Sequence, residues 1–110
     1  MSLTLRTSLG FTEAVIDGDG GLKRFYQIAS ILSDELNVAF TSKEDDFDAI
    51  NWAFQLNQYL LTLQYSIYNG ISLFPTKMGD ARKRDNEAVV QLANVLEGKL
   101  QNLDLRSRPV

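Results

Sequence analysis

The sequence predicts an α+β fold, in which one mainly antiparallel sheet of about five or six strands carries two helices on one face. Three observations lead to this two-layer sandwich. Apolar residues alternate with polar ones over two adjacent runs, 50–56 and 61–67. Apolar residues recur at helical spacing before and after the strand region, over 22–36 and 89–103. The turns between the central strands are short, which favours antiparallel neighbours.

Length and composition predict a single domain over residues 1–110, with 105–110 as a frayed tail. A chain of 110 residues with 45% hydrophobic and 23% charged residues has globular proportions and builds one hydrophobic core. There is no cysteine and no histidine. This excludes disulfides, thiolate nucleophiles, cysteine-ligated or histidine-ligated metals, and triads that use histidine as the base.

The N-terminal region predicts two strands at about 2–7 and 11–16, joined at Gly10. The pattern does not decide between a hairpin and one bent strand. The sequence Asp-Gly-Asp-Gly-Gly at 17–21 then breaks the chain and offers Asp19 as a helix N-cap. This segment lacks the twelfth-position glutamate of an EF-hand, because that position is Ile28, and it contains no phosphate-binding glycine motif.

The first helix is predicted from Leu22 to Asn37, with one apolar face made of Leu22, Phe25, Ile28, Ala29, Leu32 and Leu36. A short strand follows at 38–40, and residues 43–48 form an acidic loop. Its carboxylates (Glu44, Asp45, Asp46 and Asp48) could bind a hard cation, but a solvated charge run is the simpler interpretation.

The turns of the central strands predict their register. A two-residue loop at Asn57 and Gln58 places Leu56 opposite Tyr59 on the apolar face, and places Phe54 opposite Leu61 in the same way. A three-residue loop at 68–70, with Gly70 in the left-handed conformation, opposes Ile67 with Ile71. A helix over this region would leave Ile50, Phe54 and Leu61 on its far side, so strands are preferred.

The last helix is predicted from about Asp80 or Asp85 to Leu103, after Pro75 ends the preceding strand. Gly98 in its interior costs about 1 kcal/mol relative to alanine, which close packing on the sheet would explain.

The charge balance argues against nucleic-acid binding and the chain shows no membrane segment. The net charge is −3, and the basic cluster Arg82-Lys83-Arg84 is flanked by Asp80 and Asp85. Residues 1–6 do not resemble a signal peptide, and no run of about 18 apolar residues could span a membrane. We therefore expect a cytoplasmic protein that does not bind membranes.

Residues 49–76 contain no charged side chain, although solvent-facing sheets usually carry lysine or glutamate to block unwanted pairing. This absence predicts that the polar sheet face is covered by a protein partner or by a second copy in a homodimer. The expected interaction surface comprises Asn51, Gln55, Thr62, Gln64 and Ser66, with Tyr68, Ile71 and Phe74 as apolar anchors. The predicted function is a non-catalytic interaction module, such as an adaptor, a small chaperone or an immunity-like protein, without a cofactor.

The alternative is an enzyme or small-ligand domain, metal-dependent or not, that uses only Asp, Glu, Arg and Tyr. Its candidate residues are Asp17, Asp19 and the acidic residues of 44–48, with Arg82 or Arg84 as an anion clamp. Ligand-dependent thermal stabilisation would distinguish this alternative from a pure interaction module.

Overall fold

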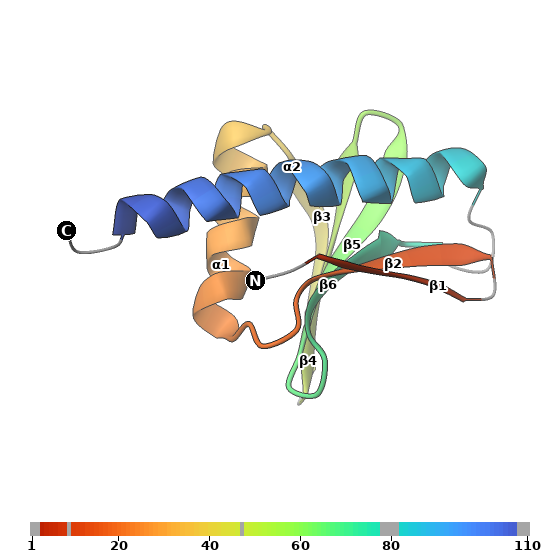
Figure 1. The fold of residues 1–110 in the computed structure, drawn as a ribbon. Coiled ribbons are helices and arrows are strands. Elements are labelled where there is room, and N and C mark those ends of the chain that lie inside the picture. The colour runs from red at the N-terminus through yellow and green to blue at the C-terminus, as the bar shows by residue number, and fades with distance from the viewer. Residues whose placement is uncertain (1–2, 9, 47, 78–81, 108–110) are drawn as a thin grey trace.

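The computed structural model describes residues 3–8, 10–46, 48–77 and 82–107, and shows one antiparallel sheet of six strands with two helices packed against it (Figure 1). The predicted fold class is confirmed. The strand order is β1-β2-β6-β5-β4-β3. The elements are β1 (Thr4–Ser8), β2 (Phe11–Asp17), α1 (Leu22–Ser30), a π-helical continuation η1 (Ile31–Glu35), β3 (Ala39–Asp45), β4 (Ala49–Leu56), β5 (Tyr59–Ser66), β6 (Gly70–Pro75) and α2 (Lys83–Ser107).

The first two strands form a hairpin, which settles the question that the sequence pattern left open. Thr4 pairs with Val15 and Ser8 with Phe11, and Gly10 has a positive φ of 85°, a conformation that glycine adopts without strain. The β2–β6 pairing then joins this hairpin to the rest of the sheet, with a register shift between Val15 and Asp17.

The β4–β5 hairpin has the predicted register: Leu56 pairs with Tyr59, and Phe54 pairs with Leu61. Asn57, the first residue of the two-residue loop, is left-handed with φ 57°. Asparagine tolerates this conformation better than most residues, so the turn and the apolar alternation agree.

The predicted β5–β6 register is wrong by two residues. Gly70 is left-handed, with φ 75°, but it pairs with Ser66, and Ile71 pairs with Tyr65 rather than Ile67. Ile67 instead lies in the turn, where its N–H donates to the carbonyl of Asp48 at 3.2 Å and its side chain is 58% exposed. A shift of two residues preserves the side-chain alternation, so β6 still turns the expected residues toward the helices.

The predicted acidic loop is largely an edge strand. Lys43 pairs with Trp52 and Glu44 with Asn51, so β3 continues to Asp45. The charges therefore line one edge of the sheet, whereas β4, β5 and β6, which carry no charged residue, lie in its interior. Charged edge strands resist unwanted pairing, so the protection that the charge-free segment lacks comes from its neighbour.

Helix α1 begins without the predicted Asp19 cap. Its N-cap is Gly21, which provides no side-chain hydrogen bond, while Asp17 Oδ1 accepts from the N–H of Asp19 at 3.2 Å and organises the preceding turn. The widened η1 segment buries both Ile31 and Leu32. Leu22, expected on the core face, is exposed instead.

Helix α2 extends to Ser107, four residues beyond the predicted end, and residues 108–110 lie outside the described part of the chain. Asn86 connects its first turns to the β1–β2 hairpin: it accepts from the N–H of Thr12 at 2.9 Å and donates to the carbonyl of Gly10 at 3.0 Å. Gly98 is exposed, with no atom within 4 Å of the place that a Cβ would occupy, so close packing does not explain it. Among the described residues, no helix is long and apolar enough to cross a membrane.

The hydrophobic core lies between the helices and one face of the sheet. Its central side chains are fully buried and come from every layer: Ile16, Phe25, Ile28, Leu32, Phe54, Leu61, Leu63, Ile71, Leu73, Val89, Leu96 and Leu100. Burial of this apolar surface is the main contribution that favours folding. The opposite face of the sheet, here called the outer face, carries the residues that alternate with these.

Candidate functional site

Most of the predicted interaction residues lie on the outer face, but Ile71 does not. Asn51, Gln55, Thr62, Gln64, Ser66 and Phe74 alternate with core residues along β4, β5 and β6. Tyr68 lies in the β5–β6 turn and is 75% exposed. Ile71 is 0% exposed and belongs to the core. Its proposed role as a surface anchor is wrong, because its pairing with Tyr65 turns it toward the helices.

The accessible part of the outer face lies over β3 and β4 rather than over its centre. Ser72 is only 2% exposed and Phe74 only 8%, which leaves Phe74 little surface to offer a partner. Gln55 is exposed, and Asn51, Ala53 and Gln64 are half-buried. The neighbouring edge strand adds three exposed residues, namely Ala39, Ser42 and Glu44. A partner on this face would therefore contact β3 and β4 most.

The five polar side chains of the predicted interaction surface already have hydrogen-bond partners within the chain. Gln64 Nε2 donates to Asn51 Oδ1 at 2.7 Å, and Gln55 Nε2 donates to the carbonyl of Asn57 at 3.0 Å. The Thr62 hydroxyl lies 2.9 Å from that of Thr76, and Ser66 Oγ accepts from the N–H of Tyr68 at 3.1 Å. Paired polar groups lose little when water is removed, so this face can be covered at low cost.

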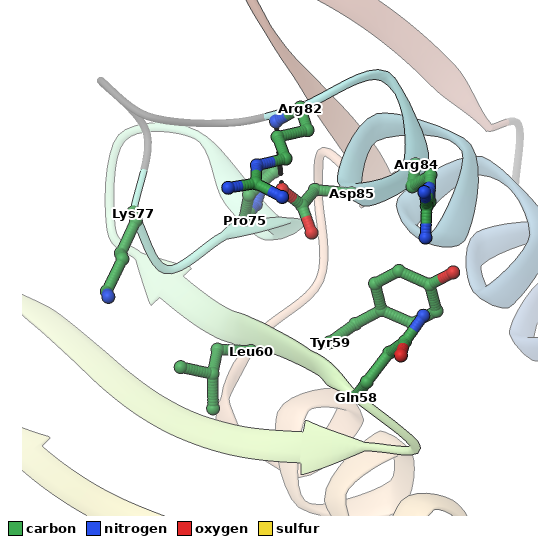
Figure 2. A pocket seen from close by; sticks show the side chains of 8 residues that line it. All are labelled: Gln58, Tyr59, Leu60, Pro75, Lys77, Arg82, Arg84 and Asp85. Atoms are coloured by element: carbon green, nitrogen blue, oxygen red, sulfur yellow. Dashed lines mark hydrogen bonds between the residues drawn. The ribbon is translucent and has the colours of Figure 1, made fainter.

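A second feature is a basic pocket of about 700 Å³ at one end of the sheet (Figure 2). The β4–β5 turn, the start of β5, the end of β6 and the start of α2 contribute its walls. It is lined by Gln58, Tyr59, Leu60, Pro75, Lys77, Arg82, Arg84 and Asp85. We call this cavity the basic pocket.

The basic pocket is lined by three cationic side chains and one carboxylate. Lys77, Arg82 and Arg84 are exposed cations, and none of them forms an ion pair with another described residue. Asp85 is the one carboxylate among the lining residues, and its Oδ2 accepts from the backbone N–H of Arg82 at 2.8 Å. Figure 2 shows Arg82 beside Asp85, Arg84 near Tyr59, and Lys77 apart from both arginines. The pocket thus offers charge-assisted donors to a carboxylate or phosphate.

The basic pocket was only partly predictable. Arg82 and Arg84 belong to the predicted basic cluster and were expected as a possible anion clamp, and both line the pocket. Lys77 and Gln58 gave no such signal. They belong to segments far apart in the sequence, which the pairing of Leu61 with Pro75 brings together.

The other candidate residues are used structurally. Asp17 forms an ion pair with Arg24, with Oδ2 and Nε 3.5 Å apart, and Asp19 contributes its N–H to the adjacent turn. Asp45 Oδ1 accepts from Trp52 Nε1 at 3.3 Å, and the Lys43 ammonium lies 4.4 Å from the centre of the Trp52 ring. Within the described ranges, no group of acidic side chains is arranged to hold a metal ion.

Comparisons with known proteins add no family or relative: no protein-family model, curated protein or solved structure matches the chain. The basic pocket and the outer face are therefore the basis for a functional proposal.

Proposed function

We propose that this chain is a non-catalytic protein-interaction domain that binds an acidic segment of a partner protein in the basic pocket. The observation that supports it is the set of three unpaired cations around one cavity, among the described residues. Cations that line a concave surface concentrate the local field, so they attract an anionic partner even when the net charge is −3. A nucleic acid is disfavoured by the same net charge, because a polyanion meets the whole surface.

The shape of the pocket favours a peptide segment over a single small anion. Its cations come from separate positions around the opening and do not converge on one point (Figure 2). Leu60 lines the pocket, is 41% exposed, and pairs with Gln55 on the outer face. One wall of the pocket, Leu60, therefore lies beside the polar surface of β4 and β5. An extended acidic segment can place several carboxylates near the cations and continue along that surface.

Binding of fluorescein-labelled hexaglutamate, measured by fluorescence anisotropy at low salt, tests this proposal. Arg82→Gln, Arg84→Gln and Lys77→Gln should each weaken binding by up to about fivefold, since one exposed charge pair contributes about 0.2–1 kcal/mol. Lys23→Gln, an exposed position on α1 away from the pocket, is the matched control and should leave binding unchanged. Binding should also weaken as salt is raised.

The same assay decides between the proposal and its alternative. If the pocket variants and the Lys23 control lose the same amount of affinity for hexaglutamate, the interaction is non-specific charge attraction and the proposal is overturned. Thermal stabilisation by inorganic phosphate that Arg84→Gln abolishes, without any peptide binding, would instead establish the small-ligand alternative. Location in the cytoplasm is part of the same proposal and is tested by cell fractionation.

A further inference from the structure

Exposed side chains of opposite charge lie near the two ends of β4. The basic pocket lies where β4 turns into β5, because Gln58 and Tyr59 line it. Three exposed carboxylates lie at the other end of β4, on the end of β3 and in the connection between the two strands: Glu44, Asp46 and Asp48. Lys43 and Asp45 of the same strand end contact Trp52 on the helix-facing side of the sheet. In Figure 1 the β4–β5 turn and the β3–β4 connection lie at opposite ends of the sheet. We call this second region the acidic end.

We propose that the partner in the basic pocket is a second copy of this chain, which binds antiparallel so that its acidic end meets the pocket; this rests on the function proposed above. A two-fold axis makes the contact reciprocal, because each copy then offers its acidic end to the basic pocket of the other. Both charged regions are used in such a dimer, so the assembly closes and does not grow into a filament.

The residues between the two charged regions suit a two-fold axis. A side chain near such an axis faces its own copy, so a charged residue there would meet a like charge. All eight residues of β4 are uncharged, and those on its outer face, Asn51, Ala53 and Gln55, are small or amide side chains. With about 3.3 Å per residue, β4 separates the charged regions by about 25 Å, and Ala53 lies near the midpoint.

The expected dimer is weak and sensitive to salt. Exposed ion pairs contribute little each, and the outer face offers few exposed apolar side chains, of which Leu60 at the rim of the pocket is the largest. The hydrogen bonds within the chain lower the cost of covering Asn51 and Gln64. Charge complementarity then determines the orientation and specificity more than the affinity.

Sedimentation equilibrium at micromolar concentration, at about 20 mM and about 500 mM salt, tests the proposal, because screening differs severalfold between these conditions. The wild type should dimerise at low salt and dissociate at high salt. Arg84→Glu alone and Asp46→Lys alone should each weaken self-association at least about tenfold, since like charges then meet at both contacts. Both side chains are exposed, and circular dichroism should show that both variants remain folded.

A mixture of the two variants provides the decisive measurement. In a mixed dimer, the glutamate introduced by Arg84→Glu in one copy would face the lysine introduced by Asp46→Lys in the other. The second contact keeps the wild-type pair, so association should return. Lys23→Glu, outside both charged regions, is the control and should dimerise like the wild type. A mixture that stays monomeric, or a dimer that neither reversal weakens, would overturn the antiparallel arrangement.

The two proposals fail separately. A wild type that is monomeric at low salt but binds hexaglutamate in an Arg84-dependent way would overturn self-association and leave the proposed function standing. A wild type that neither self-associates nor binds the peptide would overturn both.

Discussion

At the scale of single residues, the backbone at Gly70 passes so close to the loop after β2 that a side chain has no room. A Cβ there would lie within 2.5 Å of the carbonyl group of Gly18, and closer still to the carbonyl oxygen of Asp17. The φ of 75° adds a second restriction, because residues with a Cβ are strained in the left-handed region. Gly98 is the opposite case, an exposed helical glycine with open space around it.

Gly70→Ala should lower the free energy of unfolding by about 2 kcal/mol or more, because the new methyl group meets backbone atoms that cannot rotate away. Gly98→Ala should raise it by about 0.5–1 kcal/mol, since alanine restricts the unfolded chain and favours the helix. Urea unfolding followed by circular dichroism measures both changes. A Gly70→Ala variant as stable as the wild type would contradict the close approach of the two loops.

At the scale of elements, Arg24 connects the consecutive elements β2 and α1 with α2, whose Asp104 lies 80 positions further along the chain. It lies on α1, its Nε is 3.5 Å from Asp17 Oδ2 at the end of β2, and its Nη2 is 2.9 Å from Asp104 Oδ1 on α2. The same Nη2 is 3.1 Å from Asp104 Oδ2. Its buried Nη1 has no hydrogen-bond partner among the described residues. The side chain thus fixes the position of the C-terminal part of α2 relative to α1.

Arg24→Met should lower the free energy of unfolding by about 1–3 kcal/mol, because two carboxylates lose a partly buried charged hydrogen-bond donor. Lys23→Met, one position earlier and exposed, should change it by less than about 0.5 kcal/mol. A double-mutant cycle with Asp104→Asn should show coupling between positions 24 and 104. Additive effects of the two substitutions would show that the ion pair contributes nothing to stability.

At the scale of the whole molecule, the sheet combines a local meander with one long-range pairing. The strands β3 to β6 each pair with their neighbour in sequence, whereas β2 pairs with β6. The interior strands β5 and β6 carry much of the core, with Leu61, Leu63, Ile71 and Leu73 fully buried. The edge strands β1 and β3 are mostly exposed.

Amide hydrogen exchange should therefore be slowest in β5 and β6 and fastest in β1 and β3. Amides in the interior strands exchange only when the core unfolds, whereas the hydrogen bonds of an edge strand break in local openings that cost less free energy. Exchange followed by NMR at pH 7 would measure the difference. Protection in β3 equal to that in β5 would indicate that another surface, such as a second copy in a dimer, covers this edge. Dilution of the protein would then reduce the protection of β3.

The sequence by itself determined the fold class, the strands of 49–76 and the β4–β5 register, because these follow from local patterns. Alternation with a period of two assigns each residue to a face, and the two-residue loop at Asn57 and Gln58 leaves one register that keeps the apolar residues together. The left-handed conformation of Gly70 was also predicted, although the loop argument that led to it gave the wrong β5–β6 register. Most residues of the outer face were also identified, because alternation reports which face a side chain occupies.

The tertiary structure alone decided which of those residues are accessible, how strands outside the meander are ordered, and where the basic pocket forms. Alternation is unchanged by a two-residue shift, so it could not distinguish the predicted pairing of Ile71 with Ile67 from the observed pairing with Tyr65. The charge-free segment suggested an unprotected sheet, yet β3 supplies a charged edge. Lys77 and Tyr59 line the same pocket as Arg84 only because the strands pair and α2 packs on the sheet. These features depend on long-range packing of the whole core, which no local period encodes.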